Sequence, residues 1–410
     1  MSDWKKYKLG ELLSIKHGWA FKSENYVKDS KTALVTLRNI SEDSRFVFDV
    51  NKTTYYGGEY PEEYNLNEGD LIIPLTEQVI GLLGNSAFIP NFGDIKFVLN
   101  QRVGKVQEKY KKIDKIFLKY LLSTTTVRTQ MEYRASGTKQ RNISPKDIYD
   151  IEVYVPELVI QKYIGQILYN LDKKIQINNQ INQELEAMAK TLYDYWFVQF
   201  DFPDQNGNPY KSSGGKMVYH PELKREIPEG WGVEKLGDIT ICHDSKRVPL
   251  SSNDRELVKG EIPYYGATGI MDYVNDYIFD GDYVLMAEDG SVMTEKGTPI
   301  LQRISGKNWV NNHAHVLEPI KNYSCKLLMM LLKDVSVMKI KTGSIQMKIN
   351  QENMNKIVVP AIPLKLLFEI NQKLEVIDKQ QLNLIEENKQ LTQLRDWLLP
   401  MLMNGQVKVE

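Results

Sequence analysis

Two stretches of the chain carry apolar residues with the spacing of an amphipathic helix: intervals of three and four in the first, and heptad spacing in the second. One stretch follows Val155-Pro156, and the other follows Pro360 and Pro363. The pattern predicts a central helix over residues 156–200 and a C-terminal helix with a tail over residues 360–410. The apolar positions are Ile164, Leu168, Leu171, Ile175, Leu185, Met188 and Leu192 in the first, and Ile370, Leu374, Ile377, Leu384, Leu391 and Leu398 in the second.

The two predicted helices have the seam of a coiled coil, and they most simply pair with each other in antiparallel orientation. Gln381, Asn388 and Arg395 occupy seam positions that apolar residues leave open. Polar seam residues cost stability but fix the register and the choice of partner. We therefore expect a coil with one defined pairing.

The segments before the two helices alternate short β-like runs with turns, so we expect an α+β fold with two α/β domains separated by the helices. We call residues 1–155 module 1 and residues 231–359 module 2. In module 1 the pattern predicts strands at 33–37, 70–73 and 151–155, a helix over 114–131, and a helix start at Ser144-Pro145, where Ser caps and Pro occupies the first turn. In module 2 it predicts a matching helix over 326–339. Residues 201–230, rich in Pro, Gly and Ser, are expected to form a linker.

Module 2 repeats the markers of module 1 in the same order. The sequence WKKYKLGEL at 4–12 is answered by WGVEKLGDI at 231–239. Such a repeat is longer than the ~20–50 residues of a solenoid unit, so it predicts a duplicated domain. The other matched pairs are Gly69-Asp70 with Gly281-Asp282, Asn100-Gln101-Arg102 with Asn311-Asn312-His313, Gly137-Thr138-Lys139-Gln140 with Gly343-Ser344-Ile345-Gln346, and Val155-Pro156 with Val359-Pro360.

The charge of the chain is segregated although its net value is only −1. Residues 96–146 hold thirteen Lys and Arg against three acidic residues, and residues 303–356 hold nine against three. These basic stretches fall at matching places in the two modules. Segregated basic surfaces are typical of proteins that bind a polyanion, and their repetition in both modules favours nucleic-acid binding over the alternative of a solvated lysine-rich surface.

Motifs for catalysis are weak. Asn208-Pro209-Tyr210 lacks the second proline of the Asn-Pro-Pro-Tyr motif of adenine methyltransferases and falls in the linker. No phosphate-binding glycine motif indicates a nucleotide pocket, and Glu288-Asp289 has no nuclease lysine at the usual spacing. His313 and His315 could approach Cys242 or Cys325, but no metal-binding spacing is present, so we expect no metal. Two cysteines are too few for a disulfide framework.

The glycine-led loop that begins at Gly137 carries two cations and two amides before a capped helix. Arg and Lys suit guanine, and Asn and Gln suit adenine, in the major groove. The same residues could also serve only as a turn that positions the next helix. The candidate DNA-binding residues are Arg102, Lys105, Thr138, Lys139, Gln140, Arg141 and Asn142 in module 1, and Asn311, Asn312, His313, Ser344, Gln346 and Lys348 in module 2.

The ordered, doubled set of markers resembles the specificity subunit of type I restriction–modification systems over essentially the whole chain. The resemblance rests on the Trp to Lys-Leu-Gly openings, the Gly-(Thr/Ser)-x-Gln loops and the Val-Pro entries into long helices. It also includes the linker from Tyr210 to Met217 that leads to Trp231. A departure from it is the second loop, where Ile345 and Met347 replace polar residues.

The resemblance implies two target recognition domains held apart by an antiparallel coiled coil, each reading half of a bipartite, asymmetric DNA site. It implies that two modification subunits dock on the coil, bind S-adenosylmethionine and methylate adenine N6 on an extracted base. Restriction subunits would add ATP- and Mg-dependent translocation and cleavage. The chain itself would then be non-catalytic and hold no cofactor.

Two other functions stay open at this point. One is a self-contained DNA methyltransferase or nuclease, and the other is a bivalent coiled-coil scaffold for proteins. The N-terminus lacks an apolar signal core, and no apolar run reaches the ~20 residues of a membrane span. We therefore expect a cytoplasmic protein with no membrane partner.

Overall fold

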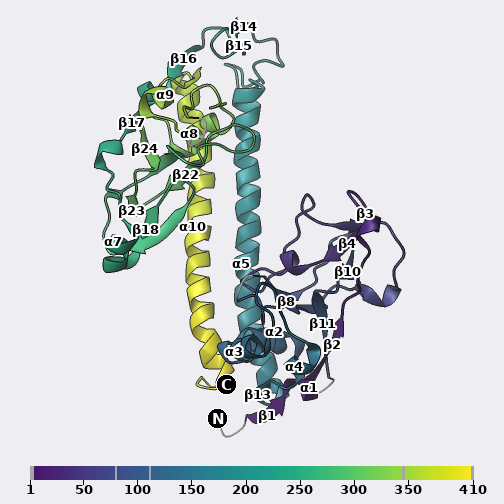
Figure 1. Cartoon of the computed structure of the whole chain (residues 1–410). Helices are drawn as coiled ribbons and strands as arrows, with labels where there is room; N and C mark the ends of the chain where they lie inside the picture. The colour runs from purple at the N-terminus through teal and green to yellow at the C-terminus, as the bar shows by residue number, and fades with distance from the viewer. Residues whose placement is uncertain (1–3, 79–80, 110–111, 344–346, 408–410) are drawn as a thin grey trace. The chain divides into compact units, whose positions relative to one another are not determined.

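A computed structural model describes residues 4–78, 81–109, 112–343 and 347–407. The chain divides into two compact units (Figure 1). Unit 1 comprises Met1–Asn178 and Glu386–Glu410, and unit 2 comprises Asn179–Ile385. Each unit therefore contains one module and half of each long helix, a division that cuts across the predicted domain boundaries.

Module 1 contains two main sheets. The first has the strand order β2-β11-β7-β9, and the second has the order β3-β5-β4-β10-β6, in which β4 and β10 are parallel. The strands are β2 (Leu13–His17), β3 (Tyr26–Val27), β4 (Thr32–Val35), β5 (Tyr55–Tyr56), β6 (Asn65–Leu66), β7 (Leu71–Pro74), β9 (Ala87–Phe88), β10 (Lys96–Leu99) and β11 (Val103–Glu108). The predicted strands at 33–37 and 70–73 correspond to β4 and β7.

Strand β1 (Lys5–Lys8), which leads into the short helix α1 (Leu9–Leu12), pairs antiparallel with β13 (Glu152–Val155). The opening marker of module 1 and its closing Val-Pro marker therefore lie side by side (Figure 1). Helix α4 (Pro145–Tyr149) begins as predicted, with the Ser144 hydroxyl accepting the Asp147 N–H at 3.2 Å.

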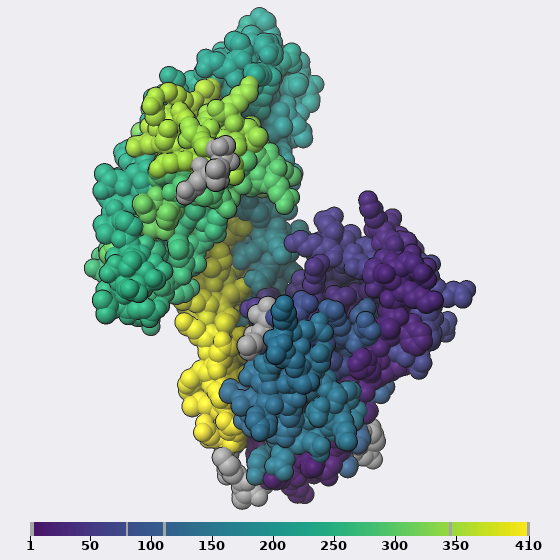
Figure 2. Space-filling view, in the orientation of Figure 1, coloured from purple at the N-terminus to yellow at the C-terminus, as the bar shows by residue number. Residues whose placement is uncertain are grey.

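The predicted helix 114–131 is instead two helices, α2 (Lys115–Ser123) and α3 (Thr125–Arg134). The break occurs because the Ser123 and Thr124 hydroxyls donate to the carbonyls of Tyr120 and Leu121, and Thr124 then caps α3. Figure 2 shows this blue segment packed against the purple N-terminal strands of the same module.

Module 2 repeats the topology of module 1. Its sheet β17-β24-β21-β22 matches β2-β11-β7-β9, and β18 and β23 form the second parallel pair. Strand β16 (Gly232–Lys235) pairs with β25 (Val358–Ala361) as β1 pairs with β13, and it leads into α6 (Leu236–Ile239). The other strands are β17 (Thr240–Cys242), β18 (Lys259–Tyr265), β19 (Ile270–Val274), β20 (Phe279–Asp280), β21 (Tyr283–Ala287), β22 (Leu301–Ile304), β23 (Lys307–Val310) and β24 (Ala314–Pro319).

Module 2 also contains α7 (Ser252–Leu257), α8 (Cys325–Lys333) and α9 (Gln351–Asn355). The prediction of a helix as far as residue 339 was wrong, because α8 ends at Lys333. The segment after Lys333 leaves the helix and packs against the loop that contains Gly297. The Val337 N–H donates to the Gly297 carbonyl at 2.9 Å, and the Val337 side chain is fully buried.

The two predicted long helices are confirmed as α5 (Leu158–Tyr193), which continues in a π-helical turn to Val198, and α10 (Leu364–Met403). Within unit 1 they run antiparallel, since Asp172 pairs with Arg395 and Asn178 with Asn388. Within unit 2 they do the same, with Gln381 bonded to Asn182 and Ile370 in one core with Ala189 and Tyr193.

All twelve predicted coil positions are buried or half-buried. Met188, which the periodicity also placed on the apolar face, is 59% exposed, and Ala189 takes the seam position instead. The polar stretch after Ile175 stays in the seam: Asn178 is fully buried and donates to Glu387 and Asn388 at 2.8 and 2.9 Å.

The predicted linker contains secondary structure of its own. It contains a hairpin of β14 (Met217–His220) and β15 (Arg225–Pro228), and Phe202 stacks between Tyr210 and Trp231. Among the described residues, no helix is long and apolar enough to cross a membrane.

Candidate DNA interface

In module 1 two loops that are far apart in the sequence meet at the end of β7. The Leu75 N–H donates to the Arg102 carbonyl at 2.9 Å, and the Leu75 carbonyl accepts the Ile143 N–H at 3.0 Å. Leu75 therefore lies between the turn at 100–102 and the loop at 137–142. We call these two segments the module 1 junction.

Module 2 has the same junction at the end of β21. The Glu288 N–H donates to the His313 carbonyl at 2.9 Å, and the Glu288 carbonyl accepts the Ile349 N–H at 2.8 Å. The turns also match, since the side-chain oxygens of Asn100 and Asn311 accept the N–H two residues later, at 3.4 and 2.8 Å. The repeat thus extends to individual hydrogen bonds. We call the turn at 311–313 and the described loop residues 342, 343, 347 and 348 the module 2 junction.

The structure brings most of the module 1 candidates together at this junction. Arg102, Thr138, Lys139 and Asn142 are exposed, and Gln140 is half-buried. Arg141 is half-buried and ion-paired with Glu77 at 3.0 Å. Lys105 lies apart, within β11, where Asp70 binds its ammonium at 2.6 Å.

In module 2, Asn312 is exposed, and the half-exposed His313 bonds Asp289 through Nδ1 at 2.5 Å. Lys348 is exposed and pairs with Glu288 at 3.0 Å. Asn311 is only 3% exposed, so its amide shapes the turn from inside. Ser344 and Gln346 lie outside the described residues.

A buried charge network that the sequence reasoning missed lies behind the module 2 junction. Arg247 contacts Asp244 at 3.1 Å and Glu288 at 2.7 Å, and His315 bonds Asp244 at 2.5 Å through Nδ1. His315 is fully buried, and its Nε2 lies 2.8 Å from the Ile349 carbonyl. No local signal joins Asp244 and Arg247 to residues 40–70 positions away, because the sheet makes the contact.

Among the described residues, Cys242, Asp244 and His315 are close enough together to suggest metal ligands. The arrangement fits a metal poorly. Both ring nitrogens of His315 already have partners, the Arg247 guanidinium lies against Asp244, and burial raises the pKa of the Cys242 thiol to about 12. A cation here would displace the arginine, so the cluster is better described as a closed hydrogen-bonded network.

The acid stability of the chain should depend on this network. Burial acts to raise the pKa of Asp244 and Glu288, but hydrogen bonds and attraction from His315 and Arg247 outweigh it and lower both pKa values. A carboxylate with a lowered folded pKa stabilises the fold above its unfolded pKa, about 4, and loses that contribution as the pH falls further.

We therefore expect the melting temperature to fall steeply below about pH 4. The measurement is thermal unfolding from pH 7 to pH 2.5. An Asp244→Asn variant should be less stable at pH 7 and should show a shallower acid dependence. Parallel curves for the two proteins would contradict this assignment.

Each module is fixed to its half of the helix pair by an aspartate of a long helix whose side chain is less than 20% exposed. In unit 1, Asp172 of α5 accepts bonds from Lys119 at 2.8 Å, Tyr120 at 2.7 Å and Arg395 at 3.0 Å. In unit 2, Asp378 of α10 pairs with Arg303 of β22. These contacts fix each module against the helices, and we call them the Asp172 clamp and the Asp378 clamp.

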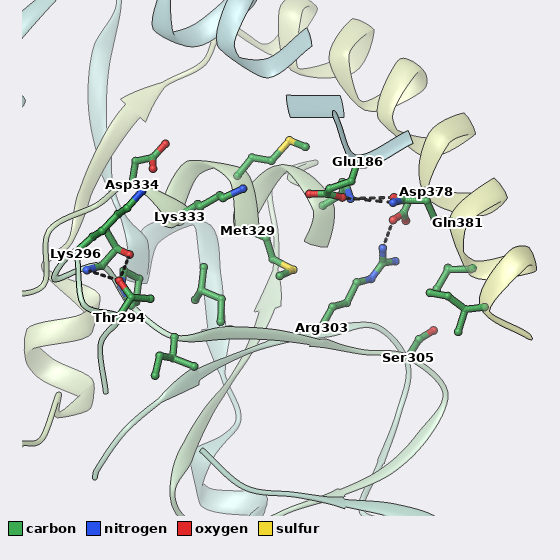
Figure 3. A pocket seen from close by; sticks show the side chains of 18 of the residues that line it. Glu186, Thr294, Lys296, Arg303, Ser305, Met329, Lys333, Asp334, Asp378 and Gln381 are labelled. Atoms are coloured by element: carbon green, nitrogen blue, oxygen red, sulfur yellow. Dashed lines mark hydrogen bonds and ion pairs between the residues drawn. The ribbon is translucent and has the colours of Figure 1, made fainter. Parts of the chain in front are cut away.

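A groove of about 890 Å³ lies beside the second of these clamps, lined by α8, the β21–β22 loop and the helix pair within unit 2. Figure 3 shows Arg303 reaching from its strand toward Asp378, with Glu186 and Gln381 alongside. Lys326 bonds Gln381 at 2.9 Å there, so polar side chains along this side of the groove already bond one another.

The doubled strand-end junction, the loops with basic side chains and the helix pair define a two-module architecture with one candidate DNA-reading surface in each module. The family model described as the type I restriction modification DNA specificity domain matches residues 1–187 and 228–393, and the chain belongs to this family. Its members are the specificity subunits, which recognise DNA sequence and are not themselves catalysts.

Relatives agree across the length of the chain. The type I restriction enzyme HindI specificity subunit of Haemophilus influenzae is 22% identical, with 99% of this chain and all of that protein covered. The MjaIX specificity subunit of Methanocaldococcus jannaschii is 24% identical over 72% of this chain and 69% of its own length. The crystal structure of a type I S subunit from M. genitalium has the same fold, with a TM-score of 0.57, 16% identity, and coverage of 100% of this chain and 97% of that one.

Proposed function

We propose that this specificity subunit reads a bipartite, asymmetric site on double-stranded DNA, with one half-site for each module. The observation that carries the proposal is the strand-end junction, which is built by the same backbone bonds in both modules. A duplicated framework with one reading surface per copy suits two contacts on one DNA molecule. Half-sites differ when the side chains on equivalent frameworks differ.

The side chains at the two junctions do differ. Module 1 offers Arg102, Lys139 and Gln140, and module 2 offers Asn312, His313 and Lys348. Cationic side chains suit guanine and carboxamides suit adenine, so two junctions that place these groups at different positions should read half-sites of different sequence. Phosphate contacts from the surrounding lysines would position the protein without selecting sequence.

The helices α5 and α10 are proposed to set the gap between the half-sites and to dock two methyltransferase subunits. Their buried polar seam supports this role, because Asn178 and Gln381 bond across the pair and disfavour sliding by a turn. S-adenosylmethionine would bind in those partners, and ATP and Mg in restriction subunits that join through them.

The test is adenine methylation across the genome of cells that carry this gene with its methyltransferase gene, compared with cells that lack this gene alone. We expect a two-part motif with an unspecified gap that disappears on deletion. Binding of the assembled complex to that motif should also weaken steeply with salt, as phosphate neutralisation requires. Methylation that survives the deletion would contradict the proposal.

A further inference from the structure

Behind each junction lies a buried carboxylate that binds a cation from the reading loop. We propose that Glu77 in module 1 and Glu288 in module 2 are positioning residues that hold these loops in place and thereby set the sequence preference of each half-site. This inference rests on the proposed function, and it assigns a role to residues that need not contact DNA.

In module 1, Glu77 is 1% exposed and joins two segments. Its Oε2 accepts the N–H groups of Gly81, Leu82 and Leu83 at 3.2, 3.0 and 3.1 Å. Its Oε1 lies 3.0 Å from the Arg141 guanidinium. A carboxylate this deeply buried is stable only with such partners, so it resists any movement of Arg141.

The backbone around this ion pair ties down the base of the loop. Strand β12 (Arg141–Asn142) pairs with β8 (Thr76–Glu77), and the Thr76 hydroxyl donates to the Asn142 side chain at 2.9 Å. At the other end Gly137 has a φ of +113°, and a Cβ there would meet the Gln140 carbonyl oxygen at 2.1 Å. The exposed residues Thr138 and Lys139 are therefore held between two fixed points.

This geometry changes the interpretation of Arg141. The sequence suggested a base contact, but its guanidinium is engaged by Glu77 and by the Glu132 carbonyl. Arg141 is better placed to anchor the loop, which leaves base reading to Lys139, Gln140 and Arg102.

In module 2 the anchor is Glu288, which is 8% exposed. Its Oε1 binds Lys348 at 3.0 Å and its Oε2 binds Arg247 at 2.7 Å. Its own backbone also bonds both segments of the junction, through His313 and Ile349. One residue thus fixes the turn and the loop together.

The two carboxylates occupy different positions of the repeat. Leu75, not Glu77, makes the backbone bonds that Glu288 makes. In each module a carboxylate therefore binds a cation of the equivalent loop, but it does so from a different position of the repeat. The conformation of one loop can thus change without a change in the other.

The experiment compares Glu77→Gln and Glu288→Gln in the full chain assembled with its methyltransferase subunits. Gln keeps the shape and removes the charge that holds the cation. Binding is measured to the methylated motif and to variants with one mismatch in either half. Because one good base contact discriminates about 5–150-fold, we expect Glu77→Gln to reduce mismatch discrimination roughly tenfold in one half-site and leave the other unchanged. Glu288→Gln should do the reverse.

Two further pairs keep the result clear if a Gln variant folds poorly. Arg141→Lys should retain more discrimination than Arg141→Gln, and Lys348→Arg more than Lys348→Gln; Lys348 is 49% exposed, so its replacement spares the core. Glu24→Gln, at a 71% exposed site, is the matched control.

Discrimination that stays intact, or that falls equally in both half-sites, would overturn the positioning role and leave Glu77 and Glu288 as structural residues only. If the parent protein itself yields no two-part motif, the proposed function fails first, and that result is distinct from either outcome.

Discussion

An Asp172→Ala variant is expected to melt roughly 6–20 °C below the parent chain. The change leaves Lys119 and Arg395, whose side chains are 7% and 16% exposed, without their shared carboxylate. Removing one partner of a buried ion pair costs about 3–5 kcal/mol. Each kcal/mol shifts the melting temperature of a domain of this size by about 2–4 °C. Thermal unfolding of the full chain measures the shift.

The matched control uses the same arginine. Asp396, 60% exposed, also pairs with Arg395, at 2.8 Å. Because exposed pairs contribute at most about 1 kcal/mol, Asp396→Ala should change the melting temperature by only a few degrees. Equal shifts in melting temperature for the two variants would show that Asp172 does not fix module 1 against the helices.

Replacing module 1 with the equivalent module of another specificity subunit is expected to exchange one half-site completely. The fusion point should follow Val155, so that β1 and β13 are transferred together as a paired unit. The second half-site and the gap should be unchanged, because module 2 and both long helices are retained. Sequencing of the methylated motif gives the answer.

The design has one structural condition. Lys119 and Tyr120 of the module bind Asp172 of the helix, so the donor must supply equivalent partners. A module 2 exchange is the reciprocal control and should alter only the other half. If either exchange alters both halves, or the gap, the modules do not read independently.

The sequence predicted the framework well because its strongest signals are periodic or repeated. Leu168, Ile175 and Leu374 follow a helical spacing that can be recognised in the sequence without knowledge of the tertiary contacts. All three lie buried in the helix pair. The Trp and Val-Pro markers predicted a duplicated domain, and the structure shows the reason: they are the paired strands that close each module.

The anchors and clamps could not be predicted, because their partners are brought together by tertiary contacts. Glu77 meets Arg141 across 64 positions and Asp172 meets Arg395 across 223. In the sequence each is an ordinary charged residue in a chain where 26% of residues are charged. The break between α2 and α3 was not predicted for another reason. The hydroxyl groups of Ser123 and Thr124 bond to backbone carbonyls and end the helix, although the apolar pattern continues through them.

The discontinuous makeup of unit 1 has a consequence for synthesis on the ribosome. Unit 1 closes only when Glu386–Glu410 joins Met1–Asn178, whereas unit 2 is one uninterrupted segment. Ile164 and Leu168 pack in one core with Leu402 and Met403, which are translated about 235 residues later. At about 5–20 residues per second, this apolar surface stays uncovered for roughly 12–47 s. The N-terminal segment of unit 1, which includes the first half of α5, is thus the part of the nascent chain most in need of protection, although it is made before unit 2.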